Sequence, residues 1–403
     1  MSLYLRGRVA GRDRLMRDAV HAAQYLEISG HERPVLMAYN PVARVNTYSS
    51  LMYSKLWQHG IAPLPLIRIT DLDVLVPLLG NMGVRVVLHM QWTSEILRQA
   101  TTEADAKEKS NEFIVLLDKF LGAGGRLTWT VHNVLPHDCK FPHIEAALQQ
   151  AVADRARLVH VLNGGTLDAT AEWFTISPEK SVHIPHPHYV GSYPDIVSRD
   201  QARYDLGLLP DEAVYLFFGA IKPYKGLEQL LDAFDTVRED GRPRRLLVAG
   251  FPDDDPGTQN LLDRCLLHPY VELHPVRIPD GELQYYLRAA DVAVLPYQRS
   301  LNSGVMMLAL SFGLPVVAPD IPATAEIVTE EVARTFRPGD QGSLASALAS
   351  SDELITPAAR EAALRMVQRF DPGKLAEQFA VLIGRVAADW PLDPPGAQHA
   401  GGR

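Results

Sequence analysis

The feature that most constrains this chain is a regular alternation of short apolar runs with longer, helix-like stretches. Strands that alternate with helices in this way are typical of repeated βαβ units and a parallel sheet. The apolar runs are residues 35–38, 84–89, 127–131 and 158–161 in the first half, and 214–218, 246–249, 292–295 and 314–318 in the second. We therefore predict an α/β fold whose strand pattern restarts midway along the chain.

A chain of 403 residues fits two domains of about 200 residues each. Between the two sets of runs, residues 184–194 are rich in Pro and aromatic residues, which is a linker composition. The predicted parts are an N-terminal helical extension (1–30), a first Rossmann-like domain (31–195), a second domain (196–373), a C-terminal helix (374–390) and a disordered tail (391–403).

Charge limits the partners of the protein. The formal net charge is -9, so the chain as a whole lacks the positive field that nucleic acids select, and we expect no nucleic-acid partner. A local exception lies near the start of the chain, which has two interpretations: a solvated helix face, or peripheral contact with anionic lipid headgroups. It consists of Arg6, Arg8, Arg12, Arg14 and Arg17.

The cysteines and the hydropathy of the chain indicate the cellular compartment of the protein. Cys139 and Cys265 are far apart in sequence and fit neither a C-x-x-C nor a zinc-ligand pattern. No apolar run approaches the roughly 20 residues of a spanning helix, and no apolar signal core precedes the first strand. We predict a cytoplasmic protein, with the inner face of the membrane as the site of any lipid contact.

A candidate phosphate-binding loop follows the first apolar run of the second half. Residues 218–226 read Phe-Gly-Ala-Ile-Lys-Pro-Tyr-Lys-Gly and lead into a helical stretch near Leu227. Positive charge and free N–H groups beside a helix N-terminus are what a diphosphate needs. Gly219, Lys222 and Lys225 are therefore candidate residues for binding a ligand that carries a diphosphate. Solvated loop lysines are the alternative interpretation.

A second candidate cradle lies further along the same half. Asn302, Ser303 and Gly304 precede the apolar helical run 305–310. Small polar residues in this position are an N-cap signal, and the free amides of the helix point at any anion placed above them. We predict that these three residues also contact the phosphate or sugar of that ligand.

With these motifs in view, the second half resembles the donor domain of the GT-B glycosyltransferases, especially glycosyltransferase family 4. The resemblance implies a GT-B fold, in which two Rossmann-like domains face each other across a cleft, and implies that Lys225 holds the donor diphosphate. It rests on the segments 218–226, 287–296, 313–318 and 326–328.

The chain also departs from that family. Its retaining enzymes usually have two glutamates separated by seven residues, and the corresponding positions here are Ser300 and Leu308. The arginine that usually follows the first glycine is Ala220, so Lys222 is a candidate to supply its charge. The departures leave open whether the anomeric configuration is retained or inverted.

The first half provides candidate acceptor-side residues. A histidine just after a strand lies at the carboxyl edge of the sheet, and an imidazole with a pKa near ~6.5 can take a hydroxyl proton. We predict His132 as a general base or donor-sugar contact, and Asn46, Tyr48, His89 and Asn133 as acceptor-side residues. Segments 89–92, 130–137 and 184–189 resemble bacterial exopolysaccharide and lipid-linked glycan glycosyltransferases.

Three other motifs have simpler explanations. Residues 122–125 (Gly-Ala-Gly-Gly) follow a helical run and end a helix rather than cradle a dinucleotide. Two aspartate clusters, 71–73 and 253–255, fit a helix N-terminus and a turn. We therefore predict no metal, with lysines and helix amides neutralising the leaving diphosphate.

These observations predict a glycosyltransferase that moves a hexosyl group, specifically mannosyl from GDP-mannose, to a sugar or lipid-linked glycan. A UDP-sugar is the alternative donor, and no further cofactor is expected. Two other functions stay open: a nucleotide-sugar epimerase of the same fold, and a non-catalytic protein that binds sugar nucleotides. Incubating the donor alone distinguishes the first, and turnover distinguishes the second.

Overall fold

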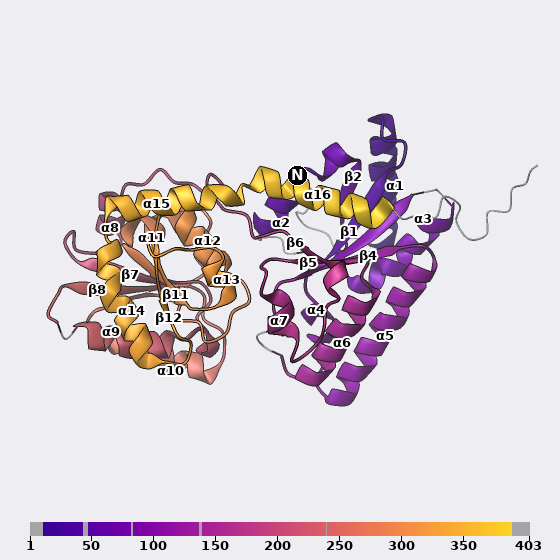
Figure 1. Cartoon of the computed structure of the whole chain (residues 1–403). Coiled ribbons are helices and arrows are strands. Elements are labelled where there is room, and N and C mark those ends of the chain that lie inside the picture. The colour runs from indigo at the N-terminus through magenta and orange to yellow at the C-terminus, as the bar shows by residue number, and fades with distance from the viewer. Residues whose placement is uncertain (1–10, 43–46, 82–83, 137–138, 239, 389–403) are drawn as a thin grey trace, which may run out of the picture. The chain divides into compact units, whose positions relative to one another are not determined.

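A computed structural model describes residues 11–42, 47–81, 84–136, 139–238 and 240–388. The chain divides into two compact units. Unit 1 runs to Pro185 and resumes at Gly373, and unit 2 is His186–Pro372. Each is described separately below (Figure 1).

Unit 1 has a parallel sheet in which, among the described residues, six strands follow the order β2-β1-β3-β4-β5-β6. Its strands are β1 (Val35–Asn40), β2 (Ile61–Pro65), β3 (Arg85–Met90), β4 (Arg126–Val131), β5 (Leu158–Val161) and β6 (Ser181–His183). Its helices are α1 (Arg12–Ile28), α2 (Thr47–Met52), η2 (Leu56–His59), η3 (Ile69–Leu75), α3 (Val76–Asn81), α4 (Ser94–Leu97), α5 (Glu103–Gly122), α6 (Pro142–Arg155), α7 (Thr166–Thr170), η4 (Pro178–Lys180) and α16 (Pro372–Ala388). Helices α5 and α6 lie side by side over this sheet (Figure 1).

Unit 2 has a second parallel sheet, again of six strands within the described residues, in the order β12-β11-β10-β7-β8-β9. Its strands are β7 (Ala213–Phe218), β8 (Arg244–Ala249), β9 (Val271–His274), β10 (Val292–Val294), β11 (Val316–Pro319) and β12 (Ala333–Phe336). Its helices are α8 (Arg199–Asp205), η5 (Pro223–Lys225), α9 (Leu227–Arg238), α10 (Pro256–Leu267), α11 (Leu283–Ala289), α12 (Gly304–Ser311), α13 (Pro322–Ala325), α14 (Gln341–Ser350), η6 (Ser351–Leu354), α15 (Pro357–Val367) and η7 (Gln368–Phe370).

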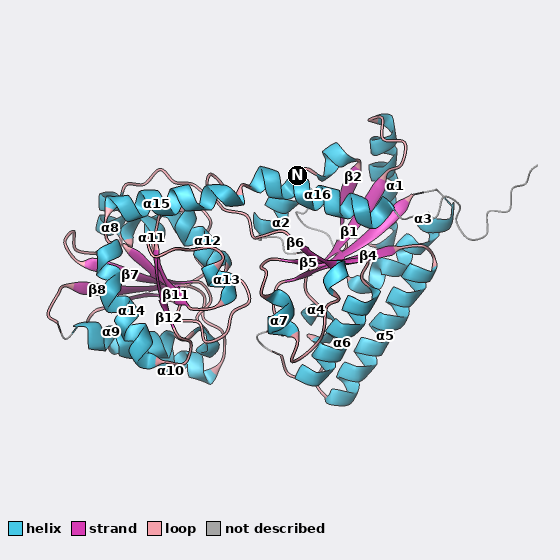
Figure 2. Cartoon of the chain, viewed as in Figure 1, coloured by secondary structure: helices cyan, strands magenta, loops and turns pink. Residues whose placement is uncertain are grey.

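Helices cover both faces of the sheet in unit 2. Figure 2 shows the strands as a central layer, with α9, α10 and α14 on one side and α8, α11 and α12 on the other. Strands covered in this way are largely apolar: β7 has no charged residue, and β8 is apolar from Leu246 to Ala249 after Arg244 and Arg245. Helix α9 instead buries one stripe, in which Leu227, Leu230, Leu231 and Phe234 recur at helical spacing. The predicted α/β class with two Rossmann-like sheets is therefore confirmed.

The observed units differ from the predicted domains at the linker. The prediction ended the first domain at residue 195, whereas unit 2 already begins at His186. The reason is that the linker binds unit 2 directly: the His188 N–H donates to the Phe370 carbonyl at 3.0 Å, and the Tyr189 N–H donates to Ser311 Oγ at 2.9 Å. Pro and aromatic residues here mark an extended segment that packs on unit 2.

The C-terminal helix α16 belongs to unit 1. Its Phe379 stacks on Tyr53 at 5.6 Å between ring centroids and contacts the rings of His89 and His160 at 5.1 and 5.7 Å. The predicted tail, 391–403, lies outside the described residues, as do Arg6 and Arg8.

A buried ion pair secures the strand that leads to the candidate donor site. The Asp291 carboxylate, just before β10, accepts hydrogen bonds from Arg203 at 2.6 Å, Arg199 at 2.8 Å and the Val214 N–H at 2.9 Å. Arg203 is itself buried and donates to several main-chain carbonyls. Removing one partner of such a buried pair is costly, about 3–5 kcal/mol, because it leaves the other charge uncompensated. Asp291 thus holds α8, β7 and β10 together.

Candidate functional site

The candidate donor site lies where the strand order of unit 2 reverses. Strands β7 and β10 are neighbours, but the chain continues outward from β7 to β8 and β9, and from β10 to β11 and β12. The carboxyl ends of two such strands form the crevice in which open α/β sheets bind ligands. The loops that leave β7 and β10 carry the two motifs predicted to hold the donor.

Three glycines let these loops pack backbone to backbone. A Cβ on Gly226, at φ +75°, would lie 1.9 Å from the Pro296 carbonyl oxygen. A Cβ on Gly250 would lie 1.6 Å from the Gly219 carbonyl oxygen, and Gly219 itself has φ +111°. Only residues without a side chain fit such approaches. The glycines of the predicted phosphate loop therefore set its shape.

Lys225 is a cation held in a partly dry environment. Its Nζ lies 4.1 Å from the ring centroid of Tyr297 and 5.5 Å from that of Tyr224. Burial, and then the charge of Lys222, lowers the pKa of Lys225 to about 8. Among the described residues, no carboxylate lies within salt-bridge distance of this ammonium. The site therefore favours an anion brought by a ligand.

Lys222 is held differently. Its Nζ lies 3.7 Å from Asp253 Oδ2, so its charge is partly balanced. Ala220, which stands where the related family has arginine, is exposed. Lys222 can therefore supply the positive charge of the missing arginine. Its attraction for an anion is weaker than that of Lys225, because Asp253 already balances part of its charge.

The N-terminus of α12 forms the other side of the candidate donor site. The Ser303 hydroxyl accepts from the Met306 N–H at 3.1 Å, which is an N-cap, and also hydrogen-bonds the buried Tyr297. Gly304 begins the helix, and Asn302 precedes the cap with its carbonyl accepting from Ser300 Oγ at 2.9 Å. Tyr297 thus contacts Lys225 with its ring and Ser303 with its hydroxyl, which ties both predicted motifs together.

His186 lies against this helix N-terminus, and sequence reasoning gave it no role. A Cβ on Gly304 would lie 3.6 Å from both His186 Nε2 and Tyr189 Oη. His186 Nδ1–H donates to the Pro187 carbonyl at 2.8 Å, and the Tyr189 hydroxyl donates to Nε2 at 3.3 Å. Burial lowers the pKa of His186 to about 4, so the imidazole is neutral. Its flanking prolines indicated only a linker.

In unit 1 the strand order reverses between β1 and β3, and His132 lies beside that point, directly after β4. Its imidazole stacks on Trp92, with centroids 4.4 Å apart and planes 20° apart, and meets the edge of Tyr48 at 5.3 Å. His132, Asn133 and the buried amide of Gln149 line a small cavity of about 30 Å³, close to the volume of one water molecule. The predicted placement of His132 at the carboxyl edge of the sheet is therefore found, and its chemical role stays a proposal.

Two predicted acceptor-side residues are in the core instead. His89 is 1% exposed, with Nδ1 2.8 Å from the Tyr53 hydroxyl and Nε2 2.8 Å from Thr130 Oγ1. Tyr48 is 2% exposed and supports the His132 ring. Both side chains are buried within unit 1, and their acceptor-side role stays a prediction. Asn46 lies outside the described residues.

The hydrogen bonds around His89 form a chain with a single direction. His160 Nε2 must donate to the Ile184 carbonyl, 2.8 Å away, because that oxygen only accepts. With neutral rings, Thr130 then donates to His160 Nδ1 at 3.0 Å and accepts from His89 Nε2–H, and Tyr53 donates to His89 Nδ1. Burial lowers the pKa of His89 to about 3, which fits a neutral ring. These histidines order the core of unit 1.

The remaining motifs have structural roles. The run 122–125 ends α5, as predicted. Asp71 accepts two hydrogen bonds from Arg68, at 2.7 and 2.9 Å, and Asp255 caps α10. Of the residues that the structure describes, no three His, Cys, Asp or Glu side chains gather as metal ligands. In the same residues, no helix is both long and apolar enough to span a membrane.

The N-terminal arginines that the structure describes are engaged locally. Arg12 pairs with Asp73, Arg14 lies 3.6 Å from Asp18, and Arg17 donates to the Asp13 carbonyl. These local contacts fit the solvated helix face, which is one of the two interpretations of the arginine-rich stretch.

Two parallel Rossmann-like sheets in one chain, with a cation and a helix N-terminus at the switch point of the second, define a GT-B protein. Residues 212–351 match the family described as Glycosyl transferases group 1. The fold is accordingly GT-B, and residues 212–351 are similar to the group 1 glycosyltransferases.

Curated relatives agree with this class. A GDP-mannose:glycolipid 4-beta-D-mannosyltransferase of Xanthomonas campestris pv. campestris is 28% identical over 249 residues, which cover 60% of this chain and 64% of that protein. A D-inositol 3-phosphate glycosyltransferase of Rhodococcus erythropolis is 35% identical over 130 residues, or 30% of this chain and 29% of that protein. The matches thus span less than two thirds of these relatives' length.

Solved structures share the fold. Sucrose-phosphate synthase from Thermosynechococcus elongatus superimposes with a TM-score of 0.68 at 17% identity, covering 89% of this chain and 100% of that one. HepE of Anabaena, in complex with UDP and glucose, gives 0.62 at 16% identity, covering 87% and 99%.

Proposed function

We propose that this protein transfers a mannosyl group from GDP-mannose to a hydroxyl of a glycan or lipid-linked glycan. The observation that carries the proposal is Lys225, a desolvated ammonium without a carboxylate partner among the described residues, at the switch point of the group 1 unit. The sugar and the acceptor class are supported by the Xanthomonas relative, whose name specifies GDP-mannose and glycolipid. A UDP-sugar is the alternative donor, supported by the UDP complex of HepE.

In the proposed mechanism, unit 2 stabilises the leaving group. As the bond between the anomeric carbon and the diphosphate oxygen breaks, negative charge grows on the diphosphate. Lys225, assisted by Lys222, and the free N–H groups at the start of α12 face that charge. Charge aimed in advance at the leaving group is usually the largest catalytic contribution. The neutral His186 lies beside this helix start, where the Pro187 carbonyl and the Tyr189 hydroxyl engage its two ring nitrogens.

We assign the acceptor proton to His132. The acceptor oxygen bonds to the anomeric carbon, and its proton passes to the imidazole, so one bond forms as the bond to the diphosphate breaks. Trp92 and Tyr48 fix the plane of this ring through stacking and edge contacts. A positioned base of this kind contributes about 10²–10⁴-fold to the rate.

We further propose inversion at the anomeric carbon. Ser300 and Leu308 occupy the positions of the paired glutamates, and they bind a loop carbonyl and pack in the core, respectively. Neither is a carboxylate. A single displacement with a general base needs no such group, and the β-linkage in the relative's name is the inverted product of α-linked GDP-mannose.

We place this reaction in the cytoplasm, which is supported by the free thiols of Cys139 and Cys265.

The test begins with thermal shifts against GDP, UDP, ADP and CDP, because ligand at about 100 times Kd adds roughly 2.7 kcal/mol. The matching nucleotide sugar is then supplied with and without a glycolipid acceptor, and the anomeric configuration of the product is read by NMR. Release of nucleoside diphosphate only with acceptor, undiminished by EDTA, is the expected result. An isomerised sugar from donor alone would indicate an epimerase, and binding without turnover would indicate a non-catalytic protein.

A further inference from the structure

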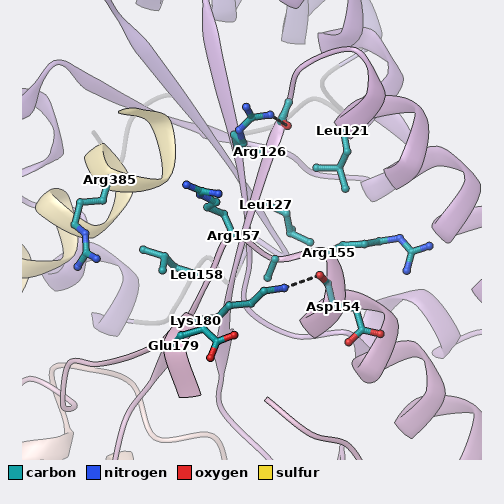
Figure 3. A pocket seen from close by; sticks show the side chains of 12 residues that line it. Leu121, Arg126, Leu127, Asp154, Arg155, Arg157, Leu158, Glu179, Lys180 and Arg385 are labelled. Carbon is teal, nitrogen blue, oxygen red and sulfur yellow. Dashed lines mark hydrogen bonds between the residues drawn. The ribbon is translucent and has the colours of Figure 1, made fainter. Parts of the chain in front are cut away.

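Unit 1 has a hollow at the opposite edge of its sheet from His132. The hollow has a volume of about 600 Å³ and lies where β4, β5 and β6 begin (Figure 3). Because β4 has six residues with a rise of about 3.3 Å each, roughly 20 Å separate this edge from the carboxyl edge. A ligand in the hollow therefore does not compete with one at His132.

Basic side chains dominate this hollow. Five cationic residues line it against two acidic ones. They are Arg126, Arg155, Arg157, Lys180 and Arg385, with Asp154 and Glu179. The chain as a whole carries a formal charge of -9, so this local excess is opposite in sign to the average surface.

Three of the cations gather here because parallel strands begin at one edge. Arg126 is the first residue of β4, Arg157 directly precedes β5, and Lys180 directly precedes β6. These three strands are neighbours in the sheet. The exposed Arg385 is added by α16. Four elements distant in sequence therefore converge, and Figure 3 shows their side chains around one space.

Two of these cations hydrogen-bond neutral main-chain acceptors. Lys180 Nζ donates to the Asp154 carbonyl at 2.7 Å, and Arg126 donates to the Gly125 carbonyl at 3.3 Å. Such bonds orient the two side chains without cancelling their charge. Burial, and then the charge of Arg157, lowers the pKa of Arg126, as expected where like charges are held together.

Arg155 is the exception. Its guanidinium binds Asp118 through two hydrogen bonds of 2.6 and 3.0 Å, and Figure 3 shows it directed away from the others. Asp154 is also partly engaged, because its Oδ1 accepts from Gln150 at 2.8 Å.

We propose that this hollow is a binding site for a phosphate-bearing anion with two or more negative charges. Guanidinium groups pair with phosphate oxygens in a bidentate manner, and several arginines around one concave surface suit a dianion. The apolar side chains of Leu121, Leu127 and Leu158 complete the wall, which suits a phosphate attached to an organic group. Such a ligand is either free in solution or the headgroup of an anionic lipid.

The test uses the full-length protein and two double variants of equal charge. Arg157→Gln with Arg385→Gln removes two exposed cations of the hollow, and Arg98→Gln with Lys107→Gln removes two exposed cations from elsewhere in unit 1. In the first arm, inorganic diphosphate is titrated by calorimetry at low salt. Any binding at the candidate donor site is common to both variants, so the difference between them reports the hollow.

The second arm measures cosedimentation with phosphatidylcholine vesicles that contain or lack phosphatidic acid. We expect the hollow variant to weaken binding in at least one arm by about tenfold or more, since two lost contacts of about 0.7 kcal/mol each give this factor. The control variant should bind like the wild type. Weakening in the first arm identifies a soluble anion, and weakening only in the second identifies a lipid headgroup.

The proposal would be overturned if the two variants bound equally well in both arms, or were weakened equally. The loss of net positive charge alone would then explain the result. Melting temperatures check that the variants fold. Arg385→Gln alone, on the exposed face of α16, repeats the comparison if the double variant is unstable.

Discussion

Replacing Lys225 by Met should weaken the binding of a nucleoside diphosphate without destabilising the fold. Methionine preserves the length of the side chain beside Tyr297 and removes the charge. In the ligand-free protein the ammonium is desolvated and lies near Lys222, which is why its pKa is lowered to about 8. Removing it should therefore leave the melting temperature unchanged or slightly raised. Affinity for a nucleoside diphosphate should fall sharply.

The magnitude follows from the burial of this charge. Two unit charges 4 Å apart interact by about 4 kcal/mol at an effective dielectric constant near 20, which is an upper bound. A hydrogen bond to a charged group contributes about 1.5–3 kcal/mol to stability. A loss of about 2–3 kcal/mol corresponds to roughly 30- to 150-fold in Kd. Lys222→Met is the matched control, with a smaller loss expected because Asp253 already balances Lys222 at 3.7 Å.

The lowered pKa of Lys225 also predicts in which direction the affinity for a nucleoside diphosphate changes with pH. Only the protonated ammonium attracts the diphosphate, so affinity is full well below the pKa of about 8 and is lost as pH rises through it. Between pH 7 and 9 the protonated fraction falls about tenfold, and Kd should rise by a similar factor. Calorimetric titration with GDP and UDP over this range measures it. A flat wild-type profile, or a Lys225→Met variant that binds as tightly as wild type, would refute the role.

Three further predictions concern other parts of the structure. Gly226→Ala should cost at least about 2 kcal/mol in urea unfolding because its Cβ meets the Pro296 carbonyl, against about 1 for Gly207→Ala, which has φ +66° but open space; equal losses would contradict the close approach. His89 binds its proton only below a pKa of about 3 in the folded state, so stability is lost as pH falls from about 6.5 toward 3; lowering the pH from 7.5 to 5.5 should cost the wild type about 1.4 kcal/mol more than His89→Gln, and parallel pH profiles would exclude this. His132→Ala should lower turnover by about 10²-fold or more with unchanged nucleotide affinity and melting temperature; wild-type turnover would remove it from the mechanism.

The central strands of both sheets could be predicted from the sequence, and the edge strands could not. All eight predicted apolar runs overlap strands of the structure. The four other strands, β2, β6, β9 and β12, are the outermost in their sheets. An edge strand has one open side, so it need not be buried on all sides, and β9 is only half-buried. An edge strand also tolerates proline, which weakens the strand signal in the sequence, and β2 contains Pro63 and Pro65. Periodicity therefore reveals the interior of a sheet better than its borders.

The residues of the candidate sites also fall into those that the sequence could locate and those that it could not. Lys225 and Ser303 could be located because each follows a predicted strand and precedes a predicted helix, which fixes the edge of the sheet on which it lies. His186 could not, because it contacts Gly304 through a fold that brings together residues over a hundred positions apart. The burial of His89 could not be predicted for a related reason. It lies within β3, one residue before its end, and its face of the sheet is covered by Phe379, which is close only in three dimensions.

The hollow of unit 1 shows that strand ends bring residues together at both edges of a parallel sheet. The carboxyl ends of neighbouring parallel strands bring their loops together, and this predicted the positions of Lys225 and His132. The amino ends must do the same. Arg126 and Arg157 each adjoin the start of a predicted strand, so their charges converge once β4 and β5 are known to be neighbours. Lys180 precedes the edge strand β6, which no apolar run reveals. The net charge of -9 gives no sign of such a cluster, because a sum over the chain carries no information about which strand ends meet.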